Sequence, residues 1–139
     1  MEDPERQPGP GPVDPDPHPE DAVAPTPQAV ADAVCRDILA IQQDSYGRGA
    51  ENAKAHVLDD TVIVILEGLE LLPNEEFMIE KGEAAAVREL REHFQQAIES
   101  TFRAAVERAT GRRVVGFASH VTLDEPRFAV EIFRLEHAR

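Results

Sequence analysis

An arginine between two glycines offers the clearest chemistry in this chain. Gly47-Arg48-Gly49 presents backbone N–H groups beside a guanidinium, a combination that can grip a carboxylate or a phosphate through two hydrogen bonds. It is not a P-loop, because no Gly-Lys-Ser/Thr follows at the required spacing. Two interpretations stay open: an anion-binding loop, or a helix-ending loop in which Arg48 pairs with an acidic neighbour.

Two further arginines extend the anion hypothesis. Arg91 lies in the longest amphipathic segment and Arg112 follows that segment directly, so with Arg48 they would make a functional anion pocket. The alternative is structural and is the main interpretation. Glu131 interrupts an otherwise apolar strand, and an inward carboxylate needs a partner such as Arg91, because a buried lone charge is costly.

The sequence patterns for a metal site or a catalytic nucleophile are weaker. Several His and Asp residues match no recognised ligand spacing, and two of them form a turn; they are His56, Asp59, Asp60, His120 and Asp124. Cys35 falls near an apolar helix stripe, where a small buried thiol is expected. Ser119 and His120 are adjacent on a strand and so point to opposite faces. The sequence therefore predicts no catalytic residue, no metal and no cofactor, and a protein that is not an enzyme.

The helices that must position these residues follow from apolar periodicity. Spacings of three and four predict helices over about residues 27–44 and 83–109, and Pro73 begins a short helix between them. Gly82 is expected to break or kink the helical segment just before the long helix. The expected helix ends are an N-cap at Thr26 and left-handed residues at Gly47 or Gly49 and at Gly111.

Two hairpins complete the predicted fold. Residues 52–58 pair with 61–68, and residues 113–121 pair with 128–136. The continuous apolar run Val62-Ile63-Val64-Ile65-Leu66 predicts a central strand covered on both faces. The fold class is therefore α+β: helix, hairpin, helices, hairpin, with a four-stranded, mainly antiparallel sheet and helices packed on it.

Both faces of this predicted sheet carry apolar side chains. In the last strand Phe128, Val130 and Ile132 point one way, while Ala129, Phe133 and Leu135 point the other way, beside Glu131. Either the helices divide between the two faces, or two copies meet sheet to sheet or helix to helix. We expect a homodimer, because soluble monomers rarely expose large apolar patches.

Composition divides the 139 residues into a tail and one domain. Nine of the eleven prolines and seven acidic side chains, against one arginine, lie in residues 1–27, which predicts a disordered Pro-rich acidic tail before a domain over 28–139. A net charge of −13 argues against nucleic-acid binding. No apolar run reaches the roughly 18–20 residues of a membrane span, so no direct membrane insertion is expected. The single cysteine fits a reducing cytosol, and we expect a cytoplasmic protein, peripheral to a membrane complex at most.

A series of short motifs carries a family resemblance over about residues 28–136. In chain order they are Tyr46-Gly47-Arg48-Gly49, Asp59-Asp60, Glu67-Gly68-Leu69, Gly82 with Arg91, Thr110-Gly111-Arg112-Arg113-Val114, Phe117-Ala118-Ser119 and Ala129–Leu135. Their order and spacing resemble a bacterial family known as the C component of a Na⁺-translocating, membrane-potential-generating system (Mps), formerly a domain of unknown function. Two positions depart from the family pattern: Leu72 replaces the usual Thr before Pro73, and His120 directly follows Ser119.

The resemblance implies an accessory or regulatory role beside a membrane Na⁺ or bicarbonate transport system. The implied partner is a membrane transporter or another protein. A second hypothesis remains beside it, in which the chain is a small-ligand or anion-binding regulator that uses the Gly47-Arg48-Gly49 loop.

Overall fold

A computed structural model describes residues 25–138, so the predicted disordered tail lies almost wholly outside the described residues. The elements are α1 (Pro27–Tyr46), β1 (Ala50–Leu58), β2 (Thr61–Leu69), α2 (Pro73–Glu80), α3 (Ala84–Thr110), β3 (Val114–Thr122) and β4 (Phe128–Leu135). Their order and type confirm the predicted α+β class, and their ends lie within about two residues of the predicted ones.

Local chemistry fixes the helix ends. The Thr26 side chain accepts a hydrogen bond from the Ala29 N–H at 3.1 Å, which satisfies one unpaired N–H at the start of α1. Gly47 ends α1 and Gly111 ends α3, both in the left-handed conformation that glycine adopts without strain. Gly82, with φ +84°, separates α2 from α3 as predicted.

The four strands form one antiparallel sheet in the order β1-β2-β4-β3. The two hairpins therefore lie side by side, and their second strands, β2 and β4, pair at the centre. Within this register Val64 lies opposite Glu131 on β4, and Glu131 lies opposite Ser119 on β3. The sheet order thus places the one acidic residue of β4 in the middle of the fold.

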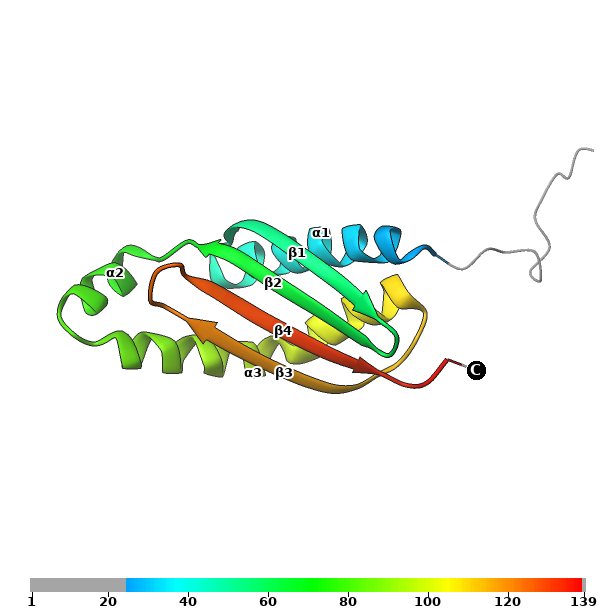
Figure 1. Ribbon diagram of the computed structural model, residues 1–139. Coiled ribbons are helices and arrows are strands. Elements are labelled where there is room, and N and C mark those ends of the chain that lie inside the picture. Colours follow the sequence, from blue (N-terminus) through cyan, green and yellow to red (C-terminus); the bar gives the residue numbers. More distant parts are fainter. Residues whose placement is uncertain (1–24, 139) are drawn as a thin grey trace, which may run out of the picture.

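Both long helices cover the same face of the sheet, with α1 over β1 and α3 over β3 (Figure 1). The main core lies between these layers, around Ile38, Val64, Leu66, Phe102 and Phe133, all of which are fully buried. Among the described residues of one copy, β2 is therefore covered on one face, and cover of its second face stays a prediction. β2 is central, but helices cover only the face formed by its even-numbered apolar residues.

No helix within residues 25–138 is both long enough and apolar enough to span a membrane. α1 and α3 are long enough to cross a bilayer, but each carries a polar face that is exposed to water.

Candidate functional site

The predicted anion residue Arg91 is held in a buried ion pair. Its Nε and Nη2 each donate to the Glu75 carboxylate at 2.8 Å, and both side chains are at most 4% exposed. Arg91 Nη2 also donates to the Glu70 carbonyl at 3.0 Å. The expected partner Glu131 was therefore wrong: the carboxylate comes from α2, which packs against α3 directly.

Tyr46 completes this network from the end of α1. Its hydroxyl donates to Glu75 at 2.6 Å, its ring lies 4.6 Å from the Arg91 guanidinium, and its edge contacts Phe94. Burial alone would raise the pKa of Glu75, but hydrogen bonds from Arg91, Tyr46 and the Leu72 N–H outweigh it and hold that pKa below its ordinary value. Burial and the bond to Glu75 raise the pKa of Tyr46 to about 12. The network ties α1, α2 and α3 together and leaves little of Arg91 for a ligand.

The Gly47-Arg48-Gly49 loop follows this network directly. The Gly49 N–H donates to the Glu70 side chain at 3.2 Å, so the loop and Arg91 both bind residue 70. Arg48 is exposed and makes no ion pair with any residue between 25 and 138. Anion binding by this loop stays a prediction, with Arg48 as its available cation.

Arg112 lies at the other end of the molecule. Its guanidinium bonds the Asp59 carbonyl at 3.0 Å, the Asp60 carboxylate and the Glu136 carbonyl, which joins the β1–β2 turn to the end of β4. The hydrogen bond from Arg112 lowers the pKa of Asp60. About twenty residues of α3 separate Arg112 from Arg91, a distance of about 30 Å along a helix. The structure therefore does not bring the three arginines into one pocket.

The remaining chemical candidates are also dispersed. Ser119 and His120 face opposite sides of β3, as predicted. Asp59 and Asp60 form the β1–β2 turn, while Asp124 follows β3 at the opposite end of the sheet. Within residues 25–138 no group of three His, Cys, Asp or Glu side chains is arranged to hold a metal ion. Burial raises the pKa of the half-buried Cys35 thiol, which disfavours its reactive thiolate.

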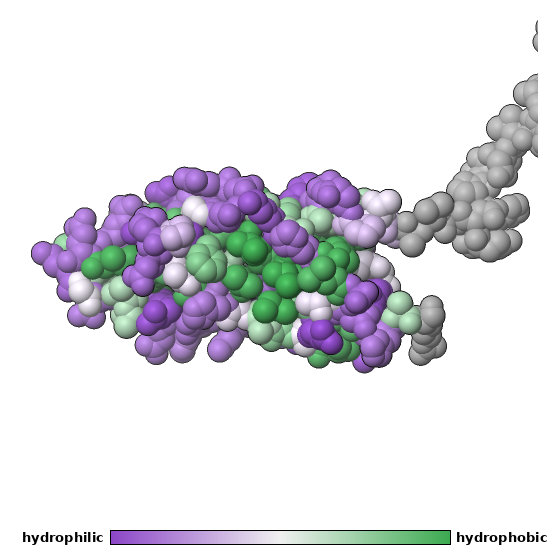
Figure 2. Space-filling model, in the orientation of Figure 1, coloured by the Kyte–Doolittle hydropathy of each residue, from purple (hydrophilic) through white to green (hydrophobic). Residues whose placement is uncertain are grey.

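The uncovered face of the sheet is an organised apolar surface. Its central residues come from the two middle strands and are Ile63, Ile65, Phe128, Val130 and Ile132, which we call the open sheet face. Figure 2 shows apolar side chains gathered over the middle of this face, bordered by hydrophilic ones. None of the five is fully buried, because residues 25–138 supply no second layer above them.

The charges around the open sheet face differ from those of the whole chain. Lys54 and Arg134 flank it from β1 and β4, Glu67 lies beside Lys54 at 3.4 Å, and His56 and His120 lie on the outer strands. Counting both histidines as neutral, this surface has more basic than acidic groups in a chain of net charge −13. Like-charge repulsion between two copies is therefore weaker across this surface than the charge of the whole chain implies.

Comparison with known proteins identifies the family of this chain. The family model described as Na⁺-translocating membrane potential-generating system (MpsC) matches residues 26–137, almost the whole of the described chain. The chain belongs to the MpsC family. No curated protein and no solved structure matches it. Family membership associates this MpsC chain with a Na⁺-translocating membrane-potential system, and it names neither a partner nor a reaction.

One feature of this MpsC chain escaped sequence reasoning. Glu75 looked like an ordinary first-turn acid of a short helix, yet it is 2% exposed and anchors Arg91. A signal was present, since an acid three residues after an N-cap position commonly turns back to the N-cap N–H, and Glu75 accepts from Leu72 at 2.8 Å. The one-sided packing of α1 and α3 is one of the arrangements that the sequence left open, and the structure selects it.

Proposed function

We propose that this chain is a non-enzymatic accessory subunit that works as a homodimer beside a Na⁺-translocating membrane system. The open sheet face carries the proposal, and a second copy of the chain is its occupant. Membership of the MpsC family supports the setting, since the family is described as part of a multi-component system. The working location would be the cytoplasmic side of that membrane complex.

Geometry supports a second copy. Four strands about 4.8 Å apart and about eight residues long give a footprint of about 500 Å² per copy, or about 1,000 Å² for two. That area reaches the threshold of a specific interface, and sheets commonly pack face to face through such β-branched rows. A two-fold axis near Ile65 and Ile132 would stack the apolar rows of one copy on those of the other.

The dimer is tested by charging the centre of the open sheet face. We expect Ile65→Lys to convert the dimer into a folded monomer, because the lysine would be buried unpaired between the copies. Leu90→Lys is the matched control, since Leu90 is a large exposed apolar residue on α3, away from this face. Sedimentation equilibrium over a range of concentrations measures the mass, and circular dichroism verifies the fold. A wild-type monomer at every concentration would overturn the second copy as occupant.

The accessory role needs a cellular measurement. In a bacterium that encodes the complete system, deletion of the gene should lower the Na⁺-dependent membrane potential reported by a voltage-sensitive dye. Wild type and Leu90→Lys should restore the potential, and Ile65→Lys should not. Full restoration by a monomeric Ile65→Lys variant would separate the two parts of the proposal, by showing that the accessory role does not need the dimer.

Anion binding by Gly47-Arg48-Gly49 is the second candidate, favoured by the exposure of Arg48 and its lack of an ion-pair partner within residues 25–138. If the loop binds anions, bicarbonate or phosphate will raise the melting temperature of wild type but not of Arg48→Ala. Equal shifts in the two proteins would exclude the loop as the binding site.

A further inference from the structure

A buried carboxylate without a partner lies beneath the helices. Glu131 projects from β4 toward the helical layer and is fully buried, yet neither of its carboxylate oxygens has a hydrogen-bond partner within residues 25–138. Gln95 of α3 is 4% exposed, and its Oε1 is equally unpartnered. Buried polar groups are almost always satisfied in native proteins, so these two exceptions need a physical explanation.

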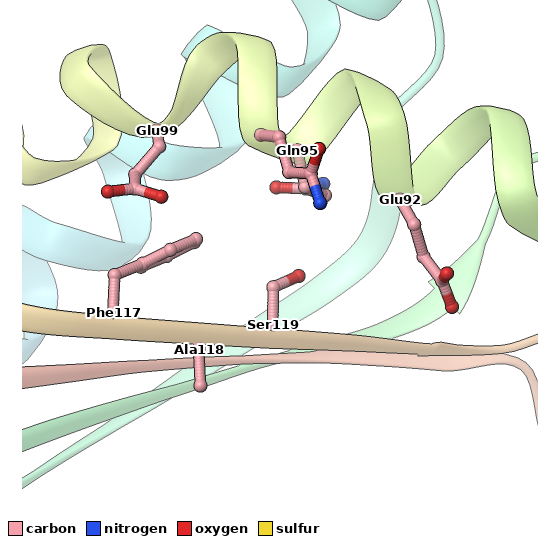
Figure 3. A pocket seen from close by; sticks show the side chains of 7 residues that line it. Glu92, Gln95, Glu99, Phe117, Ala118 and Ser119 are labelled. Carbon is pink, nitrogen blue, oxygen red and sulfur yellow. The ribbon is translucent and has the colours of Figure 1, made fainter.

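Gln95 borders a cavity, and Glu131 lies beside Ser119, another residue of the cavity lining. A space of about 260 Å³ lies between α3 and β3, lined by Gln95, Ser119, Phe117, Glu92 and Glu99 among others. Figure 3 shows Ser119 and Phe117 rising from β3 toward α3, while Ala118 points away. Ser119 pairs directly with Glu131 in the sheet, so the two side chains lie next to each other on the same face. The cavity therefore begins next to Glu131 and opens to the protein surface.

The described groups around Glu131 are neutral or acidic, apart from one arginine that is already paired. The buried residues of α1 carry no titratable side chain, and neither do the helix-facing residues of β1 and β2 that lie level with Glu131. β3 contributes only the Ser119 hydroxyl at this level. α3 contributes Arg91, which is already bound to α2, and Glu92 and Glu99 at the mouth, of which Glu99 makes its own ion pair within α3.

This environment controls the charge of Glu131. Burial raises the pKa of Glu131 to about 8, and the neighbouring Ser119 hydroxyl offsets a small part of that rise. The carboxyl therefore holds a proton in acid and neutral solution. Once ionised, it needs a positive charge in place of the proton, and hard cations prefer oxygen ligands of this kind.

We propose that Glu131, Gln95 and Ser119 form a binding site for a small monovalent cation. One carboxylate balances one positive charge, and the Gln95 and Ser119 oxygens complete the set on the side of the cavity. When the cation enters, the Glu131 proton leaves to solvent, so the net charge of the site does not change. The site lies on the helical side of the sheet, so it does not depend on the dimer proposed for the opposite face.

Thermal unfolding in matched salts tests this site. At pH 9, with Glu131 ionised, NaCl or KCl at tenfold excess over the dissociation constant should raise the melting temperature by about 5 °C relative to choline chloride of equal concentration. At pH 6 the difference should vanish, because a proton holds the carboxyl. Comparing NaCl with KCl then identifies the preferred cation.

Glu131→Gln is the decisive variant, because it keeps the shape of the side chain and removes its charge. It should fold and lose the cation-dependent shift at pH 9. Glu92→Gln removes a charge at the mouth only and should keep most of the shift. Equal melting temperatures of wild type in all three salts at pH 9, or an unchanged shift in Glu131→Gln, would overturn the proposal. Either result would leave Glu131 as a buried core carboxyl that binds no cation.

Discussion

The Glu75–Arg91 pair is the residue-scale contact on which the helical layer depends most. Removing one partner leaves the other charge buried, so Arg91→Met should reduce the free energy of unfolding by about 3–5 kcal/mol. The double variant Glu75→Gln/Arg91→Met should recover much of that loss, because it buries no charge. Urea denaturation of the wild type, both single variants and the double variant measures this coupling. Additive losses in the double variant would contradict the argument.

Glu131 predicts an unusual dependence of stability on pH. Its pKa rises from an ordinary 4.5 to about 8 on folding, so the folded chain binds more protons than the unfolded chain between these values. Stability should therefore fall as pH rises from about 4.5 to about 8 and level off above, by an amount on the order of 5 kcal/mol for this group alone. Glu131→Gln should remove that decline. Urea titrations in choline chloride at several pH values measure it, and parallel curves for the two proteins would refute it.

At the scale of elements, the start of α2 lacks a side-chain N-cap. Leu72 occupies the N-cap with extended backbone but no side-chain hydrogen bond, while Glu75 already accepts from the Leu72 N–H. Leu72→Thr should complete this reciprocal pair and raise the free energy of unfolding by about 1 kcal/mol. Leu72→Val is the matched control, because valine has the shape of threonine without its hydroxyl. Equal stability of the two variants would show that the hydroxyl makes no cap.

Sequence patterns predicted the elements better than their contacts. Thr26, Gly47 and Gly111 end helices through interactions within a few residues, and local sequence is sufficient to predict such ends. The sequence suggested Glu131 as the partner of Arg91, and only the tertiary placement of α2 brings Glu75 to it instead. Hydrophobic alternation likewise indicated that both faces of the sheet are apolar, but it contains no information on which face the helices choose.

At the scale of the whole molecule, the two proposed sites occupy opposite sides of one sheet. β4 contributes to both, because Glu131 faces the helices while Val130 and Ile132 belong to the open sheet face. A central strand therefore links the cation site to the dimer surface through a single backbone. Coupling between the sites would appear as a change in the dimer dissociation constant when NaCl replaces choline chloride at pH 9.

The net charge of −13 sets how the proposed dimer responds to ionic strength. Two acidic copies repel each other, while the surface around Ile65 and Ile132 is close to neutral. Raising choline chloride from about 10 mM to about 100 mM shortens the Debye length from about 30 Å to about 10 Å, which screens that repulsion. The dimer should therefore tighten as salt rises, and a chain lacking residues 1–24, which are mainly acidic where charged, should dimerise more tightly at low salt.

Sedimentation equilibrium at both salt concentrations measures this response, and choline avoids any binding at Glu131. An interface held by ion pairs through Lys54 and Arg134 would respond in the opposite way, because screening weakens attraction between unlike charges. If the dimer weakens as salt rises, the interface is held by ion pairs and not by apolar contacts. That result would also make an acidic partner the better occupant of the open sheet face.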